Sequence, residues 1–161
     1  MRQRLAILRA LFAVALLSFA ATARAQDGIA ACVEAASEVE ACLGHAYNAC
    51  LGTLPPPEDD DPMFTWKEND RFCWAAETAQ WDALLNRTYG DLISGIGTTF
   101  PDAPEQLRRA QRAWIVFRDA ECAWPSAFLR QNDLHNVEIA CTAELTAERV
   151  ARLVHMGAFI P

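Results

Sequence analysis

Apolar residues recur at the spacing of an α-helix in four stretches of the chain, whereas no stretch alternates in the manner of a β-strand. The four stretches cover residues 29–51, 69–96, 102–123 and 137–156. Alanine, which has the highest helix propensity, is frequent in the first of them. The pattern therefore predicts an all-α fold in which about four helices form one bundle.

Residues 54–62 interrupt the helical pattern with consecutive prolines and a run of acids. Proline removes backbone donors, and neighbouring carboxylates repel one another, so this stretch is expected to be an exposed loop. Its stiff polyproline start would hold the acidic tip away from the body. The apolar residues 63–66 are expected to lie as a lid across the bundle, before Asn69 or Asp70 caps the second helix.

The third helix has a well-defined predicted start and end. Asp102 is a candidate N-cap, Pro104 suits the first turn, and Glu105 stands three residues after the cap, as in a capping box. Pro125 disfavours helical geometry in the residue before it, so this helix is expected to end near Ala123.

Residues 81–122 combine the densest apolar helical spacing with most of the polar residues that neighbour aromatic ones. Their motifs are Leu85-Asn86-x-x-Tyr89 and Gln111-Arg112-x-Trp114-x-x-x-Arg118-Asp119-x-x-Cys122, followed later by Cys141-x-x-x-Leu145-Thr146-x-x-Arg149. In order and spacing, these motifs resemble the LprI family of bacterial lysozyme-inhibitor-like proteins, over roughly half of the chain. The resemblance implies a helical fold and the binding of a lysozyme.

The six cysteines contain no C-x-x-C pair and indicate three disulfides formed in an oxidising compartment. Helix geometry and elimination predict three pairs: Cys122 with Cys141 across a helical hairpin, Cys50 with Cys73 between the first two helices, and Cys32 with Cys42. Ten residues of continuous helix would separate the last pair by about 15 Å, too far for a disulfide. Either the first helix breaks near Ser37 or this pairing is wrong.

The first 25 residues have the features of an export signal, with a basic start, a short apolar run and an A-x-A site before Gln26. Cleavage after Ala25 would leave one periplasmic or secreted domain, residues 26–161, in which residues 26–68 form an N-terminal extension to the LprI-like part. An alternative is a lipoprotein anchored at Cys32, but that anchor would leave an odd number of cysteines.

The mature chain would be strongly acidic, because cleavage removes four arginines and leaves 10 basic against 21 acidic residues, a net charge of about −11. This charge argues against nucleic acid and anionic membrane surfaces as partners. It either favours a basic protein such as lysozyme or serves only to keep an exported protein in solution. No second apolar stretch is long enough to span a bilayer.

The polar residues best suited to binding or catalysis belong to the predicted second and third helices, next to aromatic residues. They are Asp82, Asn86, Gln111, Arg112, Arg118 and Asp119. They would form either a functional polar pocket or a structural network in which Asp82 or Asp119 pairs with Arg112 or Arg118. No nucleophile accompanies them, and the three histidines lack the partners of a metal site. Neither catalysis nor a cofactor is therefore expected.

The best candidate contact surface is the acidic tip with the aromatic residues that follow it, since acids steer a cationic protein and an exposed aromatic anchors it. The alternative is that this stretch is only a solvated linker. Its residues are Glu58, Asp59, Asp60, Asp61 and Trp66. The first hypothesis is a non-enzymatic, exported protein that binds a basic cell-wall hydrolase. The alternatives are a structural or adaptor module with another envelope partner, and an enzyme that uses Asp82 and Asp119 on cell-wall material.

Overall fold

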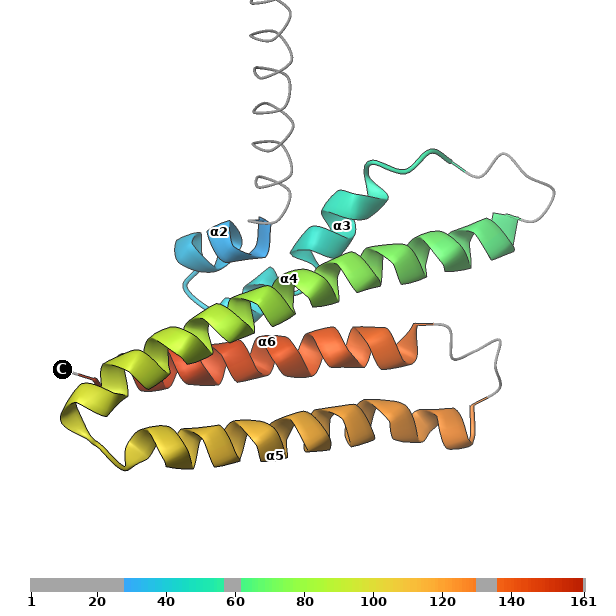
Figure 1. The fold of residues 1–161 in the computed structure, drawn as a ribbon. Coiled ribbons are helices and arrows are strands. Elements are labelled where there is room, and N and C mark those ends of the chain that lie inside the picture. The colour runs from blue at the N-terminus through green and yellow to red at the C-terminus, as the bar shows by residue number, and fades with distance from the viewer. Residues whose placement is uncertain (1–27, 57–61, 130–135, 161) are drawn as a thin grey trace, which may run out of the picture.

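A computed structural model describes residues 28–56, 62–129 and 136–160, and every regular element in these segments is helical (Figure 1). The elements are α2 (Gly28–Ala35), the 3₁₀ turn η1 (Val39–Cys42), α3 (His45–Leu51), α4 (Pro62–Thr99), α5 (Ala103–Ala123), the 3₁₀ turn η2 (Trp124–Ala127) and α6 (Val137–Gly157). The predicted all-α class is confirmed. The described segments contain five α-helices, where the sequence predicted about four.

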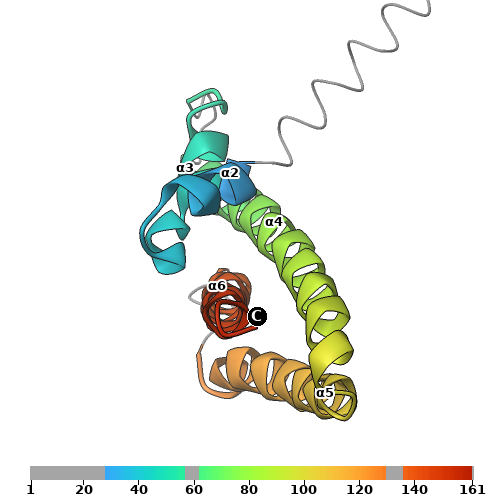
Figure 2. The same ribbon diagram turned by 90° about the vertical axis from the view of Figure 1, so that its left-hand side faces the viewer.

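The 38-residue helix α4 is the longest element, and α6 packs along it. Helix α5 runs back from the end of α4 and contacts both helices, while α2, η1 and α3 gather on the opposite side of α6 (Figure 2). The core is built from three parts of the chain: Trp81, Leu84, Leu85 and Leu92 of α4, Ala143, Ala147, Val150 and Leu153 of α6, and Ile29, Cys42 and Ala46 of the extension.

The single helix predicted over residues 29–51 is wrong, because the structure divides this stretch into α2, η1 and α3. Cys32 and Cys42 form a disulfide with a Cα–Cα distance of 5.8 Å, which one continuous helix could not allow. Of the two alternatives, the break near Ser37 is the one observed. A second turn before α3 uses Gly44, whose φ of 81° suits glycine.

The lid predicted over residues 63–66 is also wrong, since these residues form the first turns of α4. The helix starts at Pro62, and proline is well tolerated at a first helical position because its missing N–H has no intrahelical partner there. Asn69 and Asp70, predicted as caps, therefore lie inside the helix. Asp70 is buried.

Helix α5 begins and ends where predicted, but the capping box does not form. Asp102 has helical backbone angles (φ −87°, ψ −16°), unlike the extended geometry of a typical N-cap, and its side chain makes no capping hydrogen bond. Glu105 instead forms salt bridges with Arg108 and Arg112 on the surface of the same helix.

The other two predicted disulfides also form. Cys50–Cys73 joins α3 to α4, and Cys122–Cys141 joins α5 to α6, each with a Cα–Cα distance of 5.5 Å. The N-terminal extension is therefore tied covalently to α4, and the two helices of the α5–α6 hairpin are tied to each other.

Two predicted features lie outside the described residues, namely the export signal at residues 1–25 and the acidic tip Glu58–Asp61. Among the helices that are described, none combines the length and the apolar character needed to cross a membrane.

Candidate functional site

Glu77 of α4 is fully buried and connects the extension to the core. Its carboxylate accepts hydrogen bonds of 2.8 Å from the backbone N–H groups of Gly44 and Tyr47 and from the indole Nε1–H of Trp81. The two backbone donors belong to the first turn of α3, where N–H groups have no intrahelical acceptor and the helix dipole favours a negative charge. Glu77 therefore caps α3 from a different helix.

Asp70, two turns before Glu77 on α4, connects α4 to α3 and to the start of α6. Its carboxylate accepts hydrogen bonds from the hydroxyl of Tyr47 and from the side-chain amide of Asn136, next to the start of α6. Burial, followed by the hydrogen bond to Asp70 and its charge, raises the pKa of Tyr47 to about 12. The phenol thus stays protonated and continues to donate, while its ring stacks on Trp74 at a centroid distance of 4.5 Å.

Sequence analysis missed both acidic anchors. One available signal was spacing: Glu77 lies four residues after Cys73 and four before Trp81, in the middle of a buried helical stripe. A carboxylate in such a position needs hydrogen-bond donors from elsewhere in the fold.

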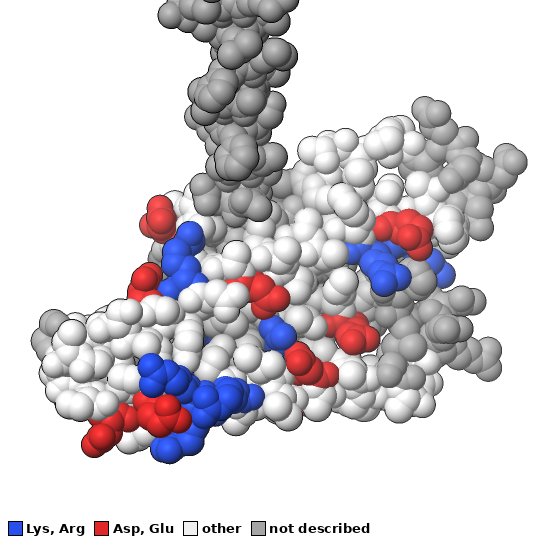
Figure 3. All heavy atoms as spheres, in the orientation of Figure 1, with Lys and Arg blue, Asp and Glu red and all other residues white. Residues whose placement is uncertain are grey.

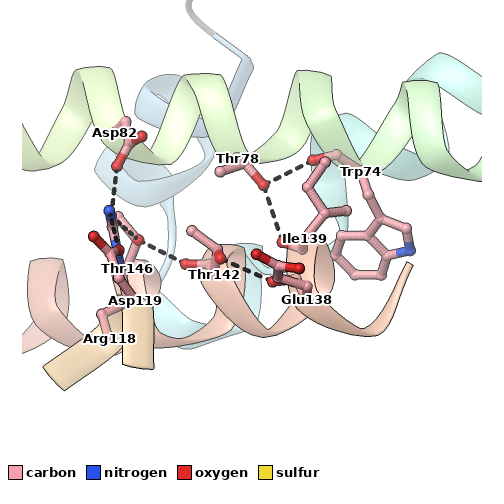
Figure 4. A network of polar contacts seen from close by, with 9 residues as sticks. All are labelled: Trp74, Thr78, Asp82, Arg118, Asp119, Glu138, Ile139, Thr142 and Thr146. Carbon is pink, nitrogen blue, oxygen red and sulfur yellow. Dashed lines mark hydrogen bonds and ion pairs between the residues drawn. The ribbon is translucent and has the colours of Figure 1, made fainter. Parts of the chain in front are cut away.

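Arg118 of α5 organises the polar network where α4, α5 and α6 meet (Figure 4). Its guanidinium lies 3.0 Å from the Asp82 carboxylate of α4 and 2.9 Å from that of Asp119, and it donates to the hydroxyl of Thr146 on α6 at 3.2 Å. The Arg118 side chain is only 14% exposed, so its charge is compensated while it is largely out of water. The network ties three helices together.

Trp114 extends this network towards Arg149 of α6. The guanidinium carbons of Arg118 and Arg149 lie 5.2 Å and 5.7 Å from the centre of its ring, within cation–π range. Arg149 also donates to the Gln111 side-chain oxygen at 3.0 Å. Burial, with a smaller contribution from Arg152, lowers the pKa of Arg149, which is the expected cost of holding a guanidinium partly out of water.

Of the six polar residues singled out from the sequence, the structure brings together four: Asp82, Gln111, Arg118 and Asp119. Arg112 points to solvent and pairs with Glu105, and Asn86 is exposed on α4. Both aspartates pair with the same arginine. The enzymatic alternative needed two convergent carboxylates in a cleft, and the salt bridges of both to Arg118 count against it.

A family model described as "Lysozyme inhibitor LprI" matches residues 65–153, which is more than half of the chain. The chain belongs to the LprI family. The matched segment contains nearly all of α4, all of α5 and most of α6, and with them both arginines that flank Trp114. The helices α2 and α3 lie before it, so the LprI match leaves out the disulfide-bonded extension.

An uncharacterised protein of Rhizobium meliloti is 34% identical to this LprI-family chain over 83 residues. The match covers 45% of this chain and 60% of the relative, so the chain spans less than two thirds of that protein's length. No solved structure matches the chain.

The start of α4 carries exposed apolar side chains, here called its apolar end and defined as Met63, Phe64, Trp66 and Phe72. Trp66, the anchor proposed from the sequence, belongs to this apolar end, and its side chain is 53% exposed. The acidic tip that precedes it in sequence lies outside the described residues.

A second surface feature is a groove of about 740 Å³ between η1 and α6, here called the η1–α6 groove. Its lining residues are Ser37, Glu38, Val39 and Glu40 on one side and Glu148, Ala151, Arg152, Val154 and His155 on the other. In the part of the chain that the structure describes, no group of three or more His, Cys, Asp or Glu residues is placed to hold a metal ion.

Proposed function

We propose that this LprI-family protein is an exported, non-enzymatic inhibitor that binds a basic cell-wall hydrolase of the lysozyme type. The observation that carries the proposal is the match of residues 65–153 to the lysozyme-inhibitor family model. The acidic composition supports a basic partner, since opposite net charges accelerate encounter. The three disulfides support an oxidising compartment outside the cytoplasm, where the predicted cleavage after Ala25 would deliver the chain.

This fold would inhibit by binding through a preformed, rigid surface and not by catalysing a reaction. The disulfides and the Arg118 network fix the helices before the partner arrives, so little ordering entropy is lost on binding. With Asp82 and Asp119 engaged by Arg118, the protein would act by occupying the cleft or rim of the hydrolase.

A titration of lysozyme turnover with the folded protein tests this proposal. We expect turnover to fall to near zero at about equimolar protein. The inhibition constant should rise about tenfold between about 0.01 M and about 0.15 M salt, because the Debye length falls from about 30 Å to about 8 Å. Unchanged turnover with excess folded protein at the lower salt concentration would rule the inhibitor out.

A second candidate function is a structural or adaptor module with another envelope protein as its partner. The apolar end of α4 favours it, since Met63 and Trp66 are exposed three residues apart on one side of the helix, and an apolar contact there would hold a partner without charge. Trp66 would be the anchor of this contact, with the acidic run Glu58–Asp61 beside it in sequence.

Pull-down from envelope extract with the W66A variant tests the adaptor function. The wild-type protein should retain its partner at about 1 M salt, where the Debye length is about 3 Å, and W66A should lose most of it. F117A on α5 is the matched control, because Phe117 is 51% exposed and lies on another helix. Equal retention by the two variants would contradict a role for the apolar end.

A further inference from the structure

The η1–α6 groove has two walls that are fixed before any partner binds. One wall is the turn between α2 and α3, which the Cys32–Cys42 disulfide closes and two backbone hydrogen bonds, from Ala41 to Glu38 and from Leu43 to Glu40, stabilise. The other wall is α6, anchored in the core by Val150 and Leu153. The groove is therefore part of the rigid body, and its volume of about 740 Å³ lies within the usual range for binding sites.

The groove is lined by both charged and apolar residues. Val39, Ala151 and Val154 provide apolar lining, and the carboxylates of Glu38, Glu40 and Glu148 are exposed. Within the described segments, none of these three carboxylates forms a salt bridge. Arg152 is the opposing cation, and with His155 neutral the lining carries a net charge of −2.

We propose that this groove receives a lysine or arginine side chain of the basic hydrolase, and this inference rests on the inhibitor function proposed above. Both residue types have an aliphatic stem that packs on apolar surface and a cationic head that stays near solvent. The stem would lie along Val39, Ala151 and Val154. The head would pair with the carboxylates of Glu38, Glu40 and Glu148, which form no salt bridge within the described part of the chain.

The charge on the α5 side of the molecule bears on where a basic partner would dock. The first half of α5 exposes Arg108, Arg109 and Arg112 beside Asp102 and Glu105, and Figure 3 shows basic and acidic side chains together over the start of that helix. With three cations against two acids, this surface is weakly basic and attracts a basic partner less than the groove does, and α6 separates it from η1 (Figure 2). The charge distribution thus favours docking on the η1 side of α6.

Inhibition of lysozyme by an E38Q/E40Q/E148Q variant, measured at two salt concentrations, tests the groove. We expect the inhibition constant to rise about tenfold at low salt and its salt dependence to flatten, because three carboxylates are lost from the contact. The control is D102N/E121Q/E138Q, which removes the same charge from exposed positions outside the groove and should stay within about twofold of wild type.

A second pair of variants blocks the groove without removing an acid. A151R places a guanidinium in the groove from α6 and should weaken inhibition about as strongly as the triple glutamine variant, while A83R adds the same charge at an exposed position of α4 and should have little effect. If wild type inhibits and each variant equals its control, the groove is excluded and the inhibitor function stands. If wild type neither binds nor inhibits lysozyme, both proposals fall.

Discussion

Replacing Glu77 by alanine is expected to lower the free energy of unfolding by about 4 kcal/mol, the largest effect of any single substitution considered. Three donors lose their acceptor, namely the N–H groups of Gly44 and Tyr47 and the indole of Trp81, and each unsatisfied buried donor costs about 1–3 kcal/mol. Urea unfolding gives the global change. Hydrogen exchange of the α3 amides reports local release of that helix.

Two comparison variants separate the hydrogen bonds from simple loss of side-chain volume. E77Q keeps the shape and one acceptor oxygen, so it should cost about half as much as E77A. E138A removes an exposed glutamate from α6 and should change stability by less than about 0.5 kcal/mol. An E77A protein as stable as E138A, with α3 equally protected, would show that Glu77 does not hold the extension.

The helices could be predicted from spacing, but their interruptions depended on information that spacing does not contain. Residues 29–51 keep their apolar period and alanine-rich composition across the break, so periodicity alone indicated one helix. The disulfide argument did require a break, because Cys32 and Cys42 could pair only if the helix stopped between them. The Cys32–Cys42 disulfide therefore predicted this break better than helix propensity did, since tertiary contacts often override propensity.

In the polar network, the sequence indicated which residues could pair, but packing decides which of them do. Arg112 and Arg118 lie six residues apart, about 120° around a helix, so the two cannot both face the same neighbours. Spacing alone did not decide which of the two faces α4, because that depends on the rotation of α5. The rotation is set by the Cys122–Cys141 bridge and by Trp114 packed against the core. Gln111, seven residues from Arg118, lies on the same side as Arg118, and it reaches Arg149.

Glu77 was missed for a different reason. Its donors, Gly44 and Tyr47, belong to a helix that the sequence did not separate from its neighbours. The unpaired backbone N–H groups at the start of α3 need an acceptor, but they can be recognised only once the break at Gly44 is known. The error in one helix boundary thus hid the residue that stabilises it.

Removing the Cys32–Cys42 disulfide with C32A/C42A is expected to lower stability by about 3 kcal/mol and also to abolish most of the inhibition. The first effect follows from the entropy that the unfolded chain regains when a loop of this length is released. The second follows from the groove, because the turn bearing Glu38 and Glu40 loses the bond that closes it onto α2, and one wall of the groove is then no longer fixed. Chemical denaturation and the lysozyme titration measure the two effects separately.

The matched control is C122A/C141A, which releases the α5–α6 bridge. Its loop of 19 residues is longer than the 10 of Cys32–Cys42, so its stability loss should be at least as large, also about 3 kcal/mol. Both groove walls keep their own anchors in this variant, so inhibition measured well below its unfolding midpoint should remain. If the two variants lose inhibition equally, binding follows overall stability. If only C32A/C42A loses it, the shape of the extension is what the partner requires.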